Sequence, residues 1–244
     1  MRALLIKELS SFFASITGYL VIVVFLILIG LFTWVFPGQF NLLDVGYANI
    51  DSLFILSPWI FLFLVPAVTM RLFSEEKKTG TLESLLTRPL SDFTIVFAKF
   101  FTGLILVLLA LLPTLIYYIT VYHLGNPTGN LDSGAIAGSY IGLVFLAAIY
   151  VSIGLFASSI TNNQIIAFLT GAAICFVFFF GFDSIGSLPV FSNMASYIYN
   201  IGISEHYKSI SRGVVDTRDI VYFLSIIAIF LLLTKIKLES RKWK

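Results

Sequence analysis

Charged residues are scarce in this chain of 244 residues, where Asp, Glu, Lys and Arg together make up 11%. A soluble globular domain carries about 25% charged residues, so the shortfall excludes a soluble core of this size. Cysteine is nearly absent too, because the chain has only Cys175, which lies inside an apolar run. A single cysteine excludes both a disulfide framework and a cysteine-rich metal site.

Motifs that carry catalysis are also missing. The sequence has no G-x-x-x-x-G-K-[ST] loop to bind a nucleotide, no H-E-x-x-H pair and no G-x-S-x-G elbow. Its only histidines, His123 and His206, lie far apart in the chain and outside the apolar runs. Two polar loop histidines are a simpler interpretation than a shared metal site, which stays the weaker alternative. We therefore expect no catalytic site, and no cofactor or metal bound by this chain.

Long apolar runs dominate what is present, since 59% of the residues are hydrophobic. Runs of about 18 or more apolar residues with few charges are typical of membrane spans. The sequence contains five such runs, over residues 19–36, 53–72, 93–122, 135–160 and 165–182, and a shorter sixth run over residues 220–234. The third is longer than one bilayer crossing and should tilt or protrude into water. We predict an all-α membrane protein whose residues 1–244 form a single transmembrane domain.

Ionisable residues are almost absent from these runs. Lys99 stands at the inner start of the third run, and Asp183 at the outer end of the fifth. Carboxylates near the middle of the bilayer are typical of proton-coupled carriers, and their absence argues against one. If the protein does transport work, the energy must come from elsewhere.

The basic residues predict the orientation. With both termini in the cytoplasm, 12 of the 15 lysines and arginines lie inside and 3 outside, whereas the 13 acidic residues divide into 6 and 7. The two short outer loops, residues 38–52 and 123–134, contain no lysine or arginine. This bias is the positive-inside pattern, so we expect a multi-pass protein with both termini cytoplasmic.

Two segments outside the runs have a helical pattern of their own. In residues 1–17, five apolar side chains recur at helical spacing, with Lys7 and Glu8 away from that stripe. This predicts an amphipathic helix in the cytoplasmic interface. The apolar stripe consists of Leu5, Leu9, Phe12, Phe13 and Ile16. In the outer segment 183–219, the apolar stretch 190–203 is too short to span and predicts a re-entrant or interfacial piece.

The cytoplasmic segment 73–91 is the most charged stretch. The second span should continue as a helix to Lys78, and Gly80 permits a break. Thr81 can then cap a short new helix with Glu83 in its first turn, and Ser91 or Asp92 can cap the third span. Leu82, Leu85 and Leu86 would give the short helix an apolar face, and Pro89 would stop it. An ordinary solvated loop is the alternative.

Small residues recur in the fourth span. Gly138 and Gly142 form one pair of small residues four apart, and Gly154 and Ser158 form another. Such pairs let helices approach closely, so they predict close contacts in the bundle without identifying the partner helix.

At this point two segments resemble a known family. The pattern R-x-x-x-E-E-K-x-x-G-T-x-E-x-L-L-T-x-P over residues 71–89 resembles the cytoplasmic coupling segment of ABC type-2 exporter permeases. Residues 205–223, with R-G-[hydrophobic]-x-D-x-R-D before the last span, resemble the outer segment of that family. The chain looks closest to the gliding-motility-associated ABC transporter permease subunit of Bacteroidota.

The resemblance implies a function and several partners. The chain would be the permease subunit of an ATP-driven exporter in the bacterial inner membrane, with outer re-entrant helices before the last span. A separate ABC ATPase would bind ATP and Mg beneath it, and a second copy or a homologous permease would complete the path. Membrane lipid and a periplasmic accessory subunit are further expected partners, whereas nucleic acid is not. The cargo, and whether any solute is moved, stay open.

The resemblance also assigns roles to residues. The ATPase-coupling interface would contain Glu75, Glu76, Lys77, Lys78, Gly80, Thr81, Glu83, Leu86 and Arg88, and the interface helix beside it Lys7 and Glu8. The outer gate segment would contain Arg212, Gly213, Asp216, Arg218 and Asp219. Two rival hypotheses remain: a membrane scaffold or channel component without an ATPase, and an intramembrane enzyme, for which the spans offer no residues.

Overall fold

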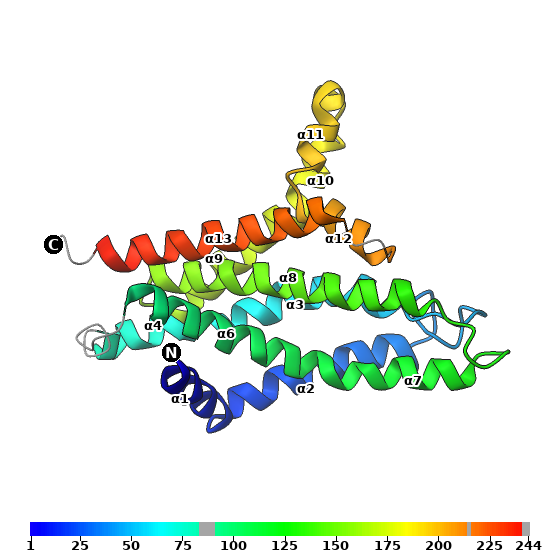
Figure 1. Ribbon diagram of the computed structural model, residues 1–244, viewed down its shortest axis with the longest axis horizontal. Helices are drawn as coiled ribbons and strands as arrows, with labels where there is room; N and C mark the ends of the chain where they lie inside the picture. The colour runs from blue at the N-terminus through cyan, green and yellow to red at the C-terminus, as the bar shows by residue number, and fades with distance from the viewer. Residues whose placement is uncertain (83–90, 214–215, 241–244) are drawn as a thin grey trace.

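The computed structural model describes residues 1–82, 91–213 and 216–240. These residues form helices joined by turns and short connections, and no strand occurs among them. The long helices run side by side along the longest axis of the molecule (Figure 1). Helix α1 (Arg2–Phe13) and the C-terminal end of α13 (Thr217–Glu239) lie at the same end of this bundle, here called the termini end.

Six helices are long and apolar enough to cross a membrane, with lengths from 18 to 33 residues. Most contain a local change of geometry, so each comprises one to three elements. They are α2 (Ile16–Gly30) with the π-helical turn η1 (Leu31–Val35); α3 (Asp51–Thr69) with α4 (Arg71–Lys78); α6 (Asp92–Leu111), η2 (Leu112–Thr114) and α7 (Leu115–Leu124); α8 (Ser133–Ile160); α9 (Gln164–Phe176), η3 (Val177–Gly181) and α10 (Phe182–Gly186); and α13.

The third of these helices is not uniform. Its α-helical geometry gives way to the 3-10 turn η2 at Pro113 and resumes in α7. Proline has no backbone N–H and its ring crowds the preceding turn, which accounts for the interruption. The helix starts at Asp92, and Ser91 caps it by accepting a hydrogen bond from the backbone of Thr94, as predicted for one of these two residues.

Helix α8 is the centre of the bundle. In its most apolar stretch 78% of the residues are buried, against 22% in α2–η1 and 28% in α9–α10. A Cβ on Gly154 would lie 2.0 Å from Thr69 Oγ1 of α3, and one on Gly138 would lie 2.8 Å from the carbonyl oxygen of Ile210. Both predicted pairs of small residues therefore mark close contacts, one with α3 and the other with α12 (Ile203–Ser211).

The N-terminal helix differs from its prediction. Helix α1 ends at Phe13, and Ile16 already belongs to α2 and is exposed. The buried positions of α1 are Leu4, Glu8 and Phe12, so Glu8 lies within the buried stripe and not away from it. The prediction was wrong here because it counted only apolar side chains, whereas Glu8 has a charged partner inside the bundle.

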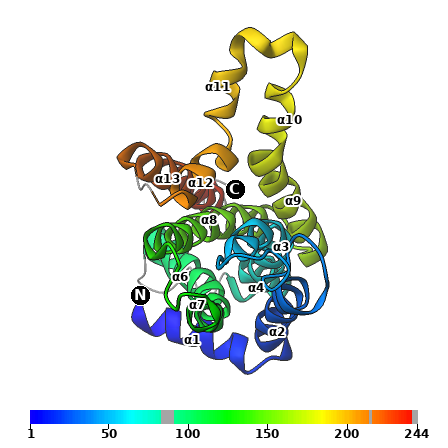
Figure 2. The same ribbon diagram turned by 90° about the vertical axis from the view of Figure 1, so that its right-hand side faces the viewer.

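The outer segment stands on one side of the bundle (Figure 1). Helix α10, the 3-10 helix η4 (Pro189–Met194) and α11 (Ala195–Tyr199) form an arm that projects away from the bundle (Figures 1 and 2). Helix α12 follows and returns to pack against α8. Residues 184–204 of this segment contain no charged side chain.

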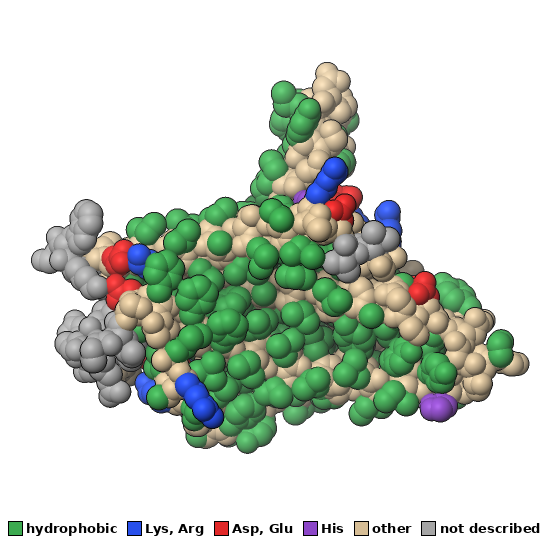
Figure 3. Space-filling model, viewed as in Figure 1, with side chains coloured by type: hydrophobic (Ala, Val, Ile, Leu, Met, Phe, Trp, Pro, Cys, Tyr) green, Lys and Arg blue, Asp and Glu red, His purple; other side chains and the backbone are tan. Residues whose placement is uncertain are grey.

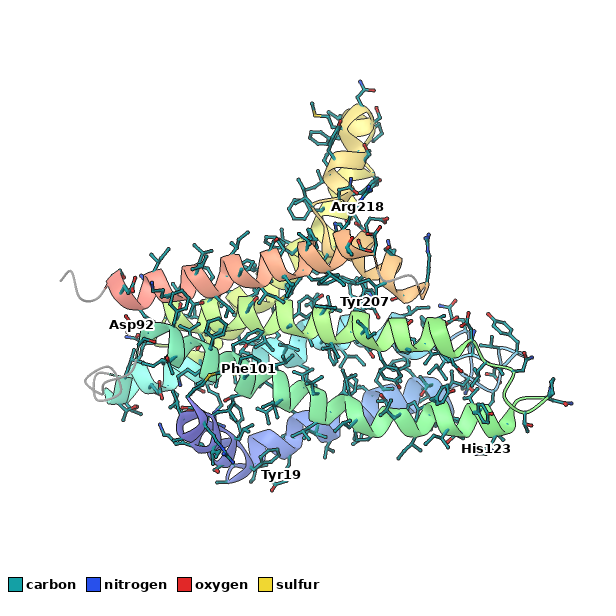
Figure 4. All side chains as sticks on the ribbon, viewed as in Figure 1. Tyr19, Asp92, Phe101, His123, Tyr207 and Arg218 are labelled. Atoms are coloured by element: carbon teal, nitrogen blue, oxygen red, sulfur yellow. The ribbon has the colours of Figure 1, made fainter. Side chains whose placement is uncertain are left out.

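Side chains are sorted along the bundle axis. On the face seen in Figure 3, hydrophobic side chains cover the middle of the bundle, and acidic and basic ones lie toward its ends and at the base of the arm. Asp92 and His123 mark opposite ends in Figure 4. This distribution is the one a bilayer requires, with apolar side chains at the depth of the hydrocarbon and charges in water.

Candidate functional site

The termini end contains a buried lysine. The Lys99 side chain, on α6, is 0% exposed. Its Nζ lies 3.3 Å from Glu8 Oε1 of α1 and 2.9 Å from Glu76 Oε2 of α4, and it donates to the Leu72 carbonyl at 2.6 Å. Two of its three N–H donors bond to Glu8 Oε1 and to the Leu72 carbonyl, and Glu76 Oε2 is an ion-pair partner. One side chain thus joins three helices.

The charges around Lys99 balance. Lys7, largely exposed on α1, lies 3.7 Å from Glu8 Oε1 and 3.8 Å from Glu76 Oε1. Two carboxylates and two ammonium groups therefore form the Lys99 cluster, which consists of Lys7, Glu8, Glu76 and Lys99. Burying an unpaired charge would be very unfavourable, whereas a paired and hydrogen-bonded one is tolerated. The cluster explains why a lysine can stand at the start of an apolar helix.

A second charged residue, Arg71, connects α4 to α1 and to the residue before α2. Arg71, at the start of α4, donates to Glu75 Oε2 at 3.1 Å and to Ser15 Oγ at 3.1 Å. Its guanidinium also lies 4.8 Å from the centre of the Phe12 ring of α1, within the range of a cation–π interaction. A shallow cleft between α1 and α4 lies beside these contacts, and its lining includes Ser11 and Thr79.

The predicted coupling residues fall into two groups. Glu76 and Glu8 point inward to Lys99, and Lys77 Nζ donates to the carbonyl oxygen of Ser159 in α8. By contrast Lys78, Gly80 and Thr81 are exposed, and Glu75 is partly exposed beside Arg71. Glu83, Leu86 and Arg88 lie outside the described residues.

The expected break after α4 is present. Helix α4 ends at Lys78 as predicted, and Gly80 has φ +73°, a left-handed conformation that glycine adopts without strain. Thr81 and Leu82 are again helical, and Leu82 is buried. The chain therefore turns sharply here, and the rest of the predicted short helix lies outside the described residues.

At the base of the arm, His206 of α12 joins the arm to α13. Its Nδ1 lies 2.7 Å from Asp219 Oδ1, its Nε2 lies 3.0 Å from the carbonyl oxygen of Asn200, and its ring stacks on Tyr222 at 3.8 Å. Tyr222 donates its hydroxyl to the carbonyl oxygen of Ile201 at 2.6 Å. Two side chains, His206 and Tyr222, thus hold the end of the arm.

The predicted outer gate residues surround this point. Asp216 caps α13 by accepting from the backbone N–H of Arg218, and Asp219 bonds to His206. Gly213 has φ +85° and approaches Ala135 so closely that a Cβ would lie 2.9 Å from its Cα. Arg212 and Arg218 have exposed side chains, so the structure brings only part of this group together.

Helix α12 is also fixed by an ion pair and a phenol. Lys208 lies 3.3 Å from both Asp183 Oδ2 and Glu205 Oε1. Partial burial lowers the pKa of Lys208, but the two carboxylates outweigh it and raise the pKa above its ordinary value. Burial raises the pKa of Tyr207 far above its ordinary value, and its hydroxyl donates to the carbonyl oxygen of Phe54 at 2.8 Å.

Three residues with clear contacts, Lys99, Arg71 and Tyr207, had no role predicted from the sequence. A signal was available for Lys99, because an ionisable residue at the edge of an apolar span is by default a functional candidate. Pro58 was a signal for Tyr207, since it leaves the carbonyl of Phe54, four residues earlier, without its helical donor. Within the described part of the chain, no group of three or more His, Cys, Asp or Glu residues could hold a metal ion.

An apolar groove lies along the side of the bundle, between α2, α3 and α9. Its lining is almost free of polar atoms. It includes Leu20, Val24, Phe32, Trp59, Phe63 and Phe168. The groove and the Lys99 cluster are separate features. The groove lies on the apolar side of the bundle, and the Lys99 cluster lies at the termini end.

One known protein family matches nearly the whole chain. The family model described as "ABC-2 family transporter protein" matches residues 3–236, which include all six long helices except the last residues of α13. No curated protein matches the chain.

Proposed function

The chain belongs to the ABC-2 family of transporter proteins, and from that membership we propose that it is an exporter subunit that transmits the movement of a separate ATPase through α4 and the segment after it. Family membership and the six apolar helices identify the chain as a membrane permease of an ABC transporter, whose kind of partner is an ABC ATPase. The ATPase would supply the nucleotide site, since this sequence has no P-loop.

The Lys99 cluster is the observation that carries the proposal. It connects α4, which leads into the predicted coupling segment, with α1 and with the membrane helix α6. A push on the exposed residues Lys78 to Thr81 would reach both helices through Lys99 and Arg71. Any such shift of conformation requires contacts that differ between two states, and the ATPase would provide them.

The proposal also fixes an orientation and a second subunit. In the proposed orientation the termini end faces the cytoplasm, as the bias of lysine and arginine predicts, and the arm lies at the outer face. A second copy or a homologous permease completes the translocation path, and α2 and α9, which are little buried within one chain, are available to it. Because the sequence resembles gliding-motility-associated permeases, we further propose that the transporter serves surface motility or secretion.

A pull-down tests the proposal. Tagged chain is extracted from its native membrane in mild detergent, and co-purifying proteins are identified by mass spectrometry. We expect a stoichiometric ATPase with a P-loop. Recovery of the chain alone, also after crosslinking, would contradict the proposal and favour a scaffold or channel component.

A matched pair of variants sharpens this test. Lys78→Glu reverses an exposed charge at the end of α4, whereas Arg218→Glu makes the same change near the base of the arm. We expect Lys78→Glu to lower the recovery of the ATPase and Arg218→Glu to leave it unchanged. Equal recovery with both variants would remove Lys78 from the interface.

A further inference from the structure

The joint between α3 and α4 is completed by a residue from another helix. Met70 stands between the two helices in helical conformation, and its backbone N–H still bonds to the carbonyl of Pro66. The first turn of any helix leaves backbone N–H groups without partners inside that helix. A side chain at the N-cap ordinarily accepts from one of them, but Met70 makes no such bond.

Ser158 of α8 takes over that task. Its Oγ accepts from the backbone N–H of Phe73 and of Ser74, both at 3.0 Å, and donates to the carbonyl of Met70 at 2.8 Å. A hydroxyl offers two acceptor sites and one donor, so the three bonds use all of them. Ser158 is 0% exposed, so bulk water does not reach these bonds.

The other end of α4 is bound to the same part of α8. Lys77 Nζ donates to the carbonyl of Ser159, one residue after Ser158. Just before the joint, Thr69 packs against Gly154, where no room for a Cβ exists. Both ends of α4 are therefore fixed to the last two turns of α8, and α8 is the most buried of the six long helices.

We infer that Ser158 is a positioning residue, which couples movement of α4 to α8 by capping α4 from the neighbouring helix. With the cap in place, a force on α4 displaces the end of α8 and is carried into the centre of the bundle. Without it, the joint at Met70 can bend and the force is lost locally. This inference rests on the proposed function, because it assumes that a partner pushes on α4.

The test compares Ser158→Ala with Ser159→Ala. The control removes a hydroxyl that is equally buried and donates within α8, to the carbonyl of Phe156. Hydrogen exchange is measured by mass spectrometry on peptides covering residues 70–80 of the whole chain. We expect exchange at Phe73 and Ser74 to rise roughly 5- to 30-fold in Ser158→Ala, the range that loss of a helix cap implies, and to stay unchanged in Ser159→Ala.

A second measurement uses the complex with the co-purified ATPase. We expect Ser158→Ala to retain the ATPase but to lose most of the dependence of hydrolysis on the permease, while Ser159→Ala behaves as wild type. Equal coupling in the two variants would overturn the inference, as would unchanged exchange at residues 73 and 74. Absence of any ATPase from the wild-type preparation would instead count against the proposed function, and the exchange experiment would still decide whether Ser158 caps α4.

Discussion

At the scale of single residues, Lys99 illustrates how a charge is kept inside a membrane protein. Its ammonium is shielded from solvent but has three oxygen partners from α1 and α4. Removing one member of such a buried group is strongly destabilising, because the remaining charges stay buried without compensation. The loss in free energy of unfolding is therefore far larger than for a surface ion pair.

We expect Lys99→Met to lower the free energy of unfolding by about 3–5 kcal/mol, since Glu8 and Glu76 would face each other without the ammonium between them. Thermal or denaturant unfolding of the purified chain in detergent would measure this. Lys208→Met is the matched control: its side chain is 53% exposed, and the loss should stay within about 1 kcal/mol. Similar losses in both variants would show that burial of Lys99 has no special energetic role.

The residue scale also shows what two of the predicted residues contact. Glu76 was predicted at the ATPase-coupling interface and Glu8 on the interface helix, and both carboxylates lie within 4 Å of Lys99 Nζ. They hold α1, α4 and α6 together, whereas Lys78 and Thr81 stay exposed on the turn after α4. The sequence identified Glu8 and Glu76 as charged residues on helices but did not show where their side chains point. Helical spacing within α1 or α4 carries no information about a lysine on α6.

At the scale of elements, Pro58 shows how one helix can supply a hydrogen-bond donor that another helix lacks. Pro58 lies inside α3 and cannot donate to the carbonyl of Phe54. The hydroxyl of Tyr207 in α12 donates to that carbonyl instead. The contact fastens α12, and with it the base of the arm, to the second long helix.

We expect Tyr207→Phe to lower the free energy of unfolding by about 1–3 kcal/mol, because it leaves the buried carbonyl of Phe54 without a donor. In a Pro58→Ala background the loss should become smaller, since the introduced alanine supplies the missing helical N–H. A double-mutant cycle would measure this coupling, which should be on the order of 1 kcal/mol. Strict additivity of the two changes in unfolding free energy would contradict the view that Tyr207 replaces the donor that Pro58 lacks. Tyr197→Phe, on the exposed arm, should leave stability unchanged and serves as the control.

At the scale of the whole molecule, charge and hydropathy agree with the path of the chain. The six long helices place both termini at one end of the bundle, and the loops at the other end that precede α3 and α8 carry no lysine or arginine. The orientation in the membrane itself stays a prediction from the positive-inside rule.

Cysteine labelling can test that orientation. Thr79→Cys and Asn130→Cys place an exposed thiol at opposite ends of the bundle, in a background where the buried Cys175 is replaced by alanine. We expect a membrane-impermeant maleimide to label Asn130→Cys on intact cells, and to label Thr79→Cys only after the membrane is opened. Labelling of Thr79→Cys on intact cells would reverse the assigned topology.

The sequence by itself determined the class of protein, the six apolar helices, the end of α4 at Lys78 and the break at Gly80. These features depend on local quantities, namely runs of apolar residues, the conformational freedom of glycine and the distribution of charges along the chain. Close packing at Gly154 was also foreseeable, although its partner α3 was not.

Only the tertiary structure decided which polar groups meet. Lys99 finds Glu8 from far back in the chain, Ser158 caps a helix that begins more than eighty residues before it, and Tyr207 fills a bond that Pro58 leaves open. In an apolar environment every buried donor, acceptor and charge needs a partner, and the partner can come from any helix that packs alongside. The sequence shows which positions require a hydrogen-bond or charge partner, and the packing of the bundle determines which residue is that partner.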